Sequence, residues 1–199
     1  MRTHFARAAL VIAVTCLSST AFAHPGGGDV HGFAHGFMHP FGGLDHVLAM
    51  ITVGLFAYQL GGRALWLVPA SFVLAMTAGG ALGLWGIQLP FVEAGIALSV
   101  LVLGAIVALG VKAPVAVAMS VVAAFAVFHG HAHGSEMPLD TSIAPYATGF
   151  VLATALLHAA GVTIGLLIGR FSEAYGRLGF RLSGGLVALA GGAILLHAI

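Results

Sequence analysis

Two short stretches of this chain combine histidines with an acidic side chain, the residue types that bind divalent metal ions. Residues 39–46 read HPFGGLDH, and residues 128–136 read FHGHAHGSE. Imidazole nitrogens and carboxylate oxygens suit Ni²⁺, Co²⁺, Zn²⁺ and Fe²⁺, whereas thiolates favour Cu⁺. The single cysteine, Cys16, is far from both stretches in the sequence. The two stretches therefore predict a metal site built mainly from nitrogen and oxygen ligands.

The spacing in the first stretch can place its ligands on one helical face. Pro40 suits the first turn of a helix, with His39 just before it. His46 follows His39 by seven residues and returns to nearly the same face, with Asp45 beside it. Met50 comes one helical turn after His46 and is a secondary candidate. The alternative is a helix start capped by polar groups, with His46 hydrogen-bonded inside a helix bundle.

The second stretch allows two backbone conformations with different consequences. In a helix, His129 and His133 share one face and His131 points away, whereas an extended segment places all three imidazoles on one side. Two glycines favour irregular backbone, and Glu136 adds a carboxylate. At membrane depth, such backbone persists only where protein or a water-filled cavity covers it. The alternative is an exposed histidine-rich loop that binds metal weakly.

The composition predicts an integral membrane protein. Charged residues make up 7% of the chain and hydrophobic residues 60%, with a mean hydropathy of +1.08. Typical soluble domains have about 25% charged residues. The 29 glycines suit helix packing in lipid, because small residues let backbones approach closely. The few basic residues form no patch, so we expect the lipid bilayer as a partner and no nucleic acid.

Residues 1–23 predict a cleaved signal peptide. Arg2 and Arg7 precede an apolar run over residues 8–17, and the Ala-Phe-Ala sequence at residues 21–23 is typical of a cleavage site. An uncleaved first helix is the alternative.

Cleavage would leave residues 24–40 as an extracytoplasmic, histidine-rich arm. The α-amine and imidazole of an N-terminal His24 can chelate one metal ion together, and the glycines that follow would form a flexible tether. A disordered tail without a metal role is the alternative for this arm.

Six apolar segments after the signal are long enough to cross about 30 Å of hydrocarbon as helices. They cover residues 41–60, 64–85, 91–111, 114–128, 144–169 and 182–198. The sequence therefore predicts an all-α, polytopic membrane protein with six transmembrane helices in one domain over residues 41–199.

Lysine and arginine residues predict the orientation of these spans. All five that follow the signal lie in the connections after the first, third and fifth spans: Arg63, Lys112, Arg170, Arg177 and Arg181. By the positive-inside rule these connections face the cytoplasm. We therefore expect a bacterial inner-membrane protein whose mature N-terminus and C-terminus are both extracytoplasmic.

Two further ionisable side chains lie within the predicted spans. Glu93 is either part of a metal path or a first-turn acid that complements the helix dipole. His158 is either a second ligand position or proton acceptor, or a buried histidine hydrogen-bonded to a nearby threonine such as Thr154.

The sequence resembles the HupE/UreJ family, membrane proteins associated with hydrogenase and urease gene clusters. The resemblance rests on the pattern H-x5-DH in residues 39–46, on residues 128–136, and on His24-Pro25 after the signal. It implies a permease for nickel, or cobalt in some members, with a transported ion and no permanent cofactor. It also implies that the transport-critical positions are His39, Asp45, His46, His129, His131 and Glu136, with His24 as an accessory position.

Three functional classes remain open from the residues. The sequence has no G-x-x-x-x-G-K-[ST] signature, so we expect facilitated or secondary transport by a permease that is not an enzyme. The main alternative is an intramembrane zinc hydrolase in which His39 and His46 help to hold Zn²⁺ and Asp45 or Glu136 acts as a general base. A metal sensor or store would bind without flux. A permease requires the two stretches to meet around one ion, and a homo-oligomer is compatible with the sequence.

Overall fold

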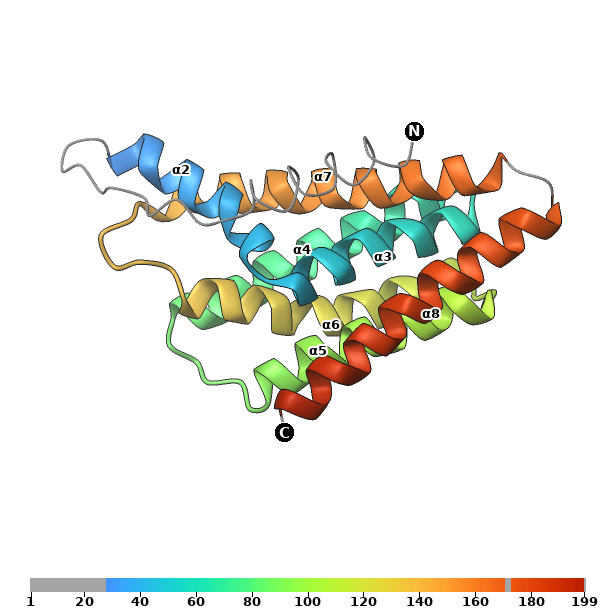
Figure 1. Ribbon diagram of the computed structural model, residues 1–199. Coiled ribbons are helices and arrows are strands. Elements are labelled where there is room, and N and C mark those ends of the chain that lie inside the picture. Colours follow the sequence, from blue (N-terminus) through green and yellow to red (C-terminus); the bar gives the residue numbers. More distant parts are fainter. Residues whose placement is uncertain (1–27, 171–172, 199) are drawn as a thin grey trace, which may run out of the picture.

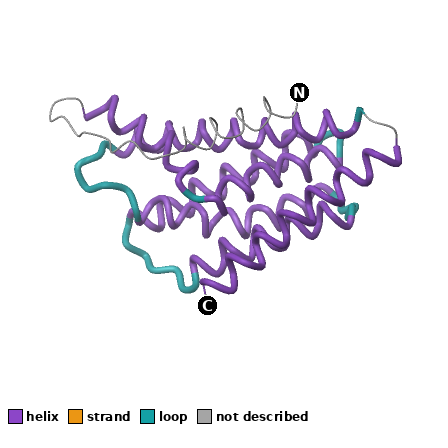
Figure 2. The backbone as a smooth tube through the Cα atoms, viewed as in Figure 1, coloured by secondary structure: helices purple, strands orange, loops and turns teal. Residues whose placement is uncertain are grey.

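The computed structural model describes residues 28–170 and 173–198, which form helices joined by short connections (Figures 1 and 2). No strand occurs in this part of the chain. The predicted signal peptide, Cys16 and His24 lie outside the described residues. The elements in chain order are α2 (Gly28–Met38), the 3₁₀ helix η1 (His39–Gly42), α3 (Leu44–Leu60), α4 (Ala64–Leu84), α5 (Val92–Leu109), α6 (Val115–Ser135), α7 (Ile143–Gly169) and α8 (Glu173–Ala198).

The helices have the length and apolar character of membrane spans. Five of the described helices pass this test alone, and a sixth span results when the bent pair His31–Gly42 and Leu44–Leu60 is counted as one. Trp66 and Trp85 are exposed at the two ends of α4. The 19 residue steps from Trp66 to Trp85 cover about 28 Å, close to the hydrocarbon thickness. The prediction of an all-α, polytopic membrane protein is confirmed.

The fourth span is longer than the sequence suggested. It was expected to end at Phe128, but α6 continues as a regular helix through the second histidine stretch to Ser135. The reason lies in the two glycines of this stretch. A Cβ atom on Gly130 or Gly134 would collide with the backbone of α4, so both glycines serve close helix packing and do not break the helix.

The first and last spans also begin at different positions. α3 begins at Leu44, after Gly43 adopts an extended conformation with φ −112° and ψ 122°. α8 begins at Glu173, before the predicted start at residue 182, and its first turns carry Arg177 and Arg181. Long cationic side chains tolerate such a position because they can reach the membrane surface.

Glycines bring three pairs of helices into backbone contact. Gly130 packs on the backbone of α4, Gly54 and Gly161 join α3 to α7, and Gly104 packs on α8. In each case a Cβ atom on the glycine would collide with the backbone of the neighbouring helix, which cannot move aside as a flexible side chain can. The bundle therefore consists of the pairs α3–α7, α4–α6 and α5–α8, which lie side by side in Figure 1.

The chain from α2 to α3 is a broken helix that follows α7. The segment His31–Gly42, which includes η1, and the segment Leu44–Leu60 meet at an angle of 85°. Gly36 of α2 packs against Tyr146 near the start of α7, whereas Gly54 of α3 packs against His158 near the middle of α7. The break therefore lies along α7 between these two levels, and it leaves Asp45 and His46 partly buried while Phe41 and Leu44 are exposed.

Figure 1 shows that the helices cross the bundle in alternating directions. The connections after α3, α5 and α7 lie at one end, and those after α4 and α6 lie at the other, together with the end of α8. Arg63 and Lys112 belong to the first end, whereas His133 and Glu136 belong to the second. The cationic and histidine-rich ends are thus opposite. Which end faces the cytoplasm remains a prediction from the positive-inside rule.

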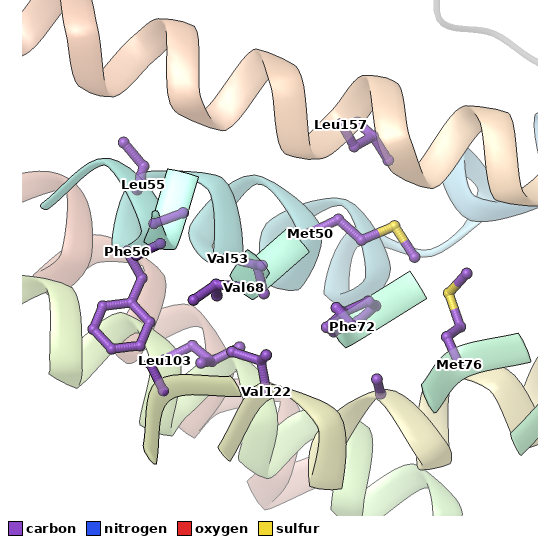
Figure 3. Close-up of a cluster of buried hydrophobic side chains, with 14 of the residues drawn as sticks. Met50, Val53, Leu55, Phe56, Val68, Phe72, Met76, Leu103, Val122 and Leu157 are labelled. Atoms are coloured by element: carbon purple, nitrogen blue, oxygen red, sulfur yellow. The ribbon is translucent and has the colours of Figure 1, made fainter. Parts of the chain in front are cut away.

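An apolar core fills the bundle between these two ends (Figure 3). Met50, Phe56, Phe72, Met76 and Leu103 are among its completely buried side chains. α4, α6 and α7 contain no acidic residue, and the acids of α3 and α5, Asp45 and Glu93, lie in the first turns of those helices. An ion that crossed the core would therefore rely on neutral polar atoms, such as those of histidine, threonine, methionine or the backbone.

Candidate metal site

The site begins with a carboxylate and an imidazole in the first turn of α3. The Oδ1 atom of Asp45 accepts a hydrogen bond from the backbone N–H of His46 at 2.7 Å and lies 2.8 Å from the Nδ1 atom of the same histidine. A carboxylate at Nδ1 holds the proton there and leaves the Nε2 lone pair free, which is the arrangement found behind metal-bound histidines. The Nε2 atom of His46 is buried and has no hydrogen-bond partner.

The two histidine stretches meet at this point. The ring centroid of His46 lies 4.8 Å from that of His129 and 4.5 Å from that of His133, and the rings cross edge to face. His129 and His133 share one face of α6 because four residues make about one helical turn. The helical conformation therefore brings together two of the three imidazoles, as expected for a helix over this stretch.

A second contact between the stretches involves His39 in η1. Its ring centroid lies 4.7 Å from that of His133, and its Nε2 atom lies 3.2 Å from the Oε2 atom of Glu136. The carboxylate of Glu136 is more than half exposed, whereas His39 is largely covered. This contact therefore places a charged group at the surface directly above the buried imidazoles.

Ser99 of α5 fixes the tautomer of His129. The Ser99 hydroxyl donates its single proton to the backbone oxygen of Ile96 at 2.6 Å, and it lies 2.8 Å from the Nε2 atom of His129. The hydroxyl must therefore accept a proton from Nε2, which leaves the Nδ1 lone pair of His129 free. That Nδ1 atom is buried and has no partner. Sequence reasoning missed Ser99, because nothing in the sequence shows which face of α5 meets α6.

Several buried imidazole nitrogens in this cluster lack hydrogen-bond partners. They are His46 Nε2, His129 Nδ1, and both ring nitrogens of His133. A buried polar atom without a partner costs about 1–3 kcal/mol, so a native structure needs a reason to keep four of them together. A divalent cation provides such a reason for three of the four, since it can accept one lone pair from each ring.

A cavity of about 810 Å³ leads to these imidazoles. Glu93 lines its wall, which places this acid near Asp45 and Glu136 on the same aqueous space. His31 and His35 of α2 also line the cavity, although no sequence pattern distinguishes them from the other histidines of the arm. The acidic and histidine lining comprises His31, His35, His39, Asp45, His46, Glu93, His133 and Glu136.

Three candidate residues lie apart from this cluster. His131 points away from His129 and His133, and its Nε2 atom lies 2.8 Å from the backbone oxygen of Ile87 in the α4–α5 connection. Met50 is completely buried in the apolar core, and His158 lies deeper, in the middle of α7. The roles of all these residues remain predictions.

The histidines of the cluster lie close together but do not form a complete coordination shell. Among residues 28–170 and 173–198, no three histidine, cysteine or acidic side chains have the geometry of a complete metal-binding group.

Comparisons with known proteins agree over most of the chain. A family model described as HupE / UreJ protein matches residues 12–194. The curated protein named Protein HupE, from Rhizobium leguminosarum bv. viciae, is 47% identical over 194 residues, which cover 96% of this chain and 98% of that protein. No solved structure matches the chain.

Proposed function

Because the chain belongs to the HupE/UreJ family, we propose that it is a permease that carries a divalent transition metal across the bacterial inner membrane. Nickel is the first candidate and cobalt the second, and the ion would serve hydrogenase or urease maturation. The observation that carries this proposal is the meeting of His46, His129 and His133 inside a helical membrane bundle, with free lone pairs on all three.

The cavity supports capture of a cation from the extracytoplasmic side. Its acids, Asp45, Glu93 and Glu136, give the space a negative charge when ionised, and such a lining raises the local concentration of cations. His39 and Glu136 lie at the outer end of the route, and His46, His129 and His133 lie deeper. An ion that exchanges water for these ligands one at a time avoids a single large dehydration barrier.

The ligand chemistry supports nickel or cobalt without selecting between them. Imidazole and carboxylate groups suit both ions, and the affinity of such sites for Ni²⁺ generally exceeds that for Co²⁺. No chemical group in the cluster acts as a built-in energy source. Facilitated diffusion or secondary transport is therefore the proposed mode.

Uptake of ⁶³Ni²⁺ into proteoliposomes tests the proposal directly. The wild-type protein should accumulate the isotope, and unlabelled Co²⁺ should compete for it. The His46→Ala variant should lose uptake, whereas His197→Ala, which alters an exposed histidine at the end of α8, should retain it. Equal uptake by protein-free and wild-type vesicles would contradict a permease. Metal binding without flux would indicate a sensor or store instead.

A further inference from the structure

His158 is a buried histidine that the outer cluster does not use. Its side chain is 2% exposed, and neither ring nitrogen has a hydrogen-bond partner. The sequence left open that Thr154 satisfies this histidine. Instead, the Thr154 hydroxyl donates to the Sδ atom of Met76 at 3.7 Å. An ionisable side chain in the middle of a membrane helix with no protein partner needs another explanation, and function is the usual one.

Other ligand atoms gather on the same side of α7. Thr154 precedes His158 by four residues, so both side chains leave one face of the helix. Because the Thr154 hydroxyl donates its proton to Met76, its oxygen lone pairs remain available. Figure 3 shows Met50 and Met76 extending toward one another beside Leu157 and Phe72. An imidazole, a hydroxyl oxygen and a thioether sulfur thus lie on adjacent turns where α7 faces α4, because His158 contacts Phe72 and Thr154 contacts Met76, four residues after Phe72.

His158 lies next in depth after the outer cluster, toward the middle of the membrane-spanning bundle. The Phe72 ring lies 5.7 Å from the ring of His129 and 5.0 Å from the ring of His158, measured between centroids. His129 belongs to the outer cluster, so one aromatic side chain separates that cluster from His158. His158 is also the fifteenth residue beyond Ile143 in a 27-residue helix, which places it close to the midpoint of the span.

We propose that His158, with the Thr154 hydroxyl and the Met76 thioether, forms an inner metal station on the transport route. This inference rests on the proposed function and adds a second binding position to it. The outer cluster includes carboxylates, whereas α4 and α7, which carry the inner ligands, contain no acidic residue. Neutral ligands bind a divalent ion more weakly than charged ones. An ion that reaches His158 can therefore continue toward the cytoplasm, as conduction requires.

A transport measurement gives the first test. His158→Ala should lower the rate of ⁶³Ni²⁺ uptake by about tenfold or more, since loss of a group that only supports a metal ligand already costs about 10- to 100-fold. Its calorimetric Kd for Ni²⁺ at the outer cluster should equal that of the wild type, since His46, His129 and His133 are untouched. His158→Gln keeps a polar side chain of similar size and should show the same loss. Wild-type uptake by both variants would overturn the inner station.

A cysteine at the same position gives a test that does not depend on transport. The chain has one cysteine, Cys16, so a Cys16→Ser background is free of thiols. In this background, His158→Cys should give a near-ultraviolet cobalt–thiolate absorption band when Co²⁺ is added to the purified protein. The matched control is Ala160→Cys, which places the thiol two residues away on an exposed face of α7 and should give no band.

The two measurements separate failure of the inner station from failure of the permease proposal. Absence of the band in His158→Cys, in a sample that still binds Co²⁺ by calorimetry and elutes as a folded protein, would overturn the inner station alone. A band in that variant together with no wild-type uptake would keep the station and contradict the permease.

Discussion

The Nε2 atom of His39 lies 3.2 Å from the Oε2 atom of Glu136, so the start of the first histidine stretch touches the end of the second. These residues are far apart in the sequence and come from η1 and the end of α6. Both line the outer cavity. A cation that enters the cavity therefore meets an imidazole and a carboxylate that already contact each other. Either side chain can bind the cation only after the contact between His39 and Glu136 has broken.

Glu136→Gln should slow uptake because the amide keeps the size of the side chain but removes its charge. We expect the rate of ⁶³Ni²⁺ uptake at low metal concentration to fall by about tenfold. The loss should be smaller at saturating metal, since the carboxylate mainly concentrates the ion. Asp140→Asn removes a negative charge from the nearby α6–α7 connection and serves as the control. Equal losses in both variants would indicate a general charge effect.

Ser99→Ala should impair metal binding through the tautomer of His129. Without the hydroxyl, the proton on Nε2 loses its acceptor, and the Nδ1 lone pair is no longer held free for an ion. Loss of such a supporting group typically lowers metal affinity by about 10- to 100-fold. Calorimetry with Ni²⁺ on the purified protein measures this. Ser120→Ala, on an exposed part of α6, should bind as the wild type does. Unchanged affinity in Ser99→Ala would remove the tautomer argument.

Alanine substitutions of His131 and His133 should have different effects on Ni²⁺ binding and on uptake. His133→Ala removes a ring from the outer cluster and should abolish both Ni²⁺ binding and uptake. The family resemblance implies that His131 is also critical, but this side chain contacts the backbone of Ile87. We therefore expect His131→Ala to lose uptake while keeping Ni²⁺ binding, measured by calorimetry. Loss of binding in His131→Ala, with correct folding, would show that the histidine turns toward the cluster.

Gly130→Ala should destabilise the bundle. Its Cβ atom would collide with the backbone of Met76, and overpacking of this kind typically costs about 1–3 kcal/mol. The midpoint of thermal unfolding in detergent should fall. Gly185→Ala is the matched control, because no atom lies within 4 Å of its added Cβ and alanine favours a helix over glycine. A lower midpoint for the control, or an unchanged one for Gly130→Ala, would contradict the α4–α6 contact.

Reporter fusions should assign the two ends of the bundle to opposite sides of the membrane. An enzyme that is active only in the cytoplasm should work when fused after Arg63 and fail when fused after Glu136. A periplasmic reporter should give the reverse pattern. The expectation follows from the cationic connections at one end. The same reporter active at both positions would overturn the proposed topology.

Sequence alone predicted six spans, of which five pass the test of length and apolar character alone and a sixth when the bent pair is counted as one. Hydropathy locates the spans because each must bury about 20 apolar residues in lipid, and a spacing of four places His129 and His133 on one helical face. The pairing of helices was not predictable, because all the spans are similarly apolar. This pairing decides that Ser99 faces His129 and that His131 faces Ile87.

Helix boundaries were predicted less well where glycine has two uses. The glycines of the second stretch suggested a break after Phe128, yet Gly130 and Gly134 lie inside α6 against α4. Gly43, by contrast, does precede the start of α3, in an extended conformation that any residue can adopt. A Cβ atom there would meet the side chains of Asp45 and His46, so this glycine also serves a close approach, which the sequence alone does not show.

The glycine contacts also divide the bundle mechanically. The backbone contacts within α3–α7 and within α4–α6 leave no space between the paired helices, so we expect each pair to move as a unit. His46 belongs to the first pair, and His129 and His133 belong to the second. A cation bound by all three rings, as proposed, would link the two pairs, and its release would remove that link.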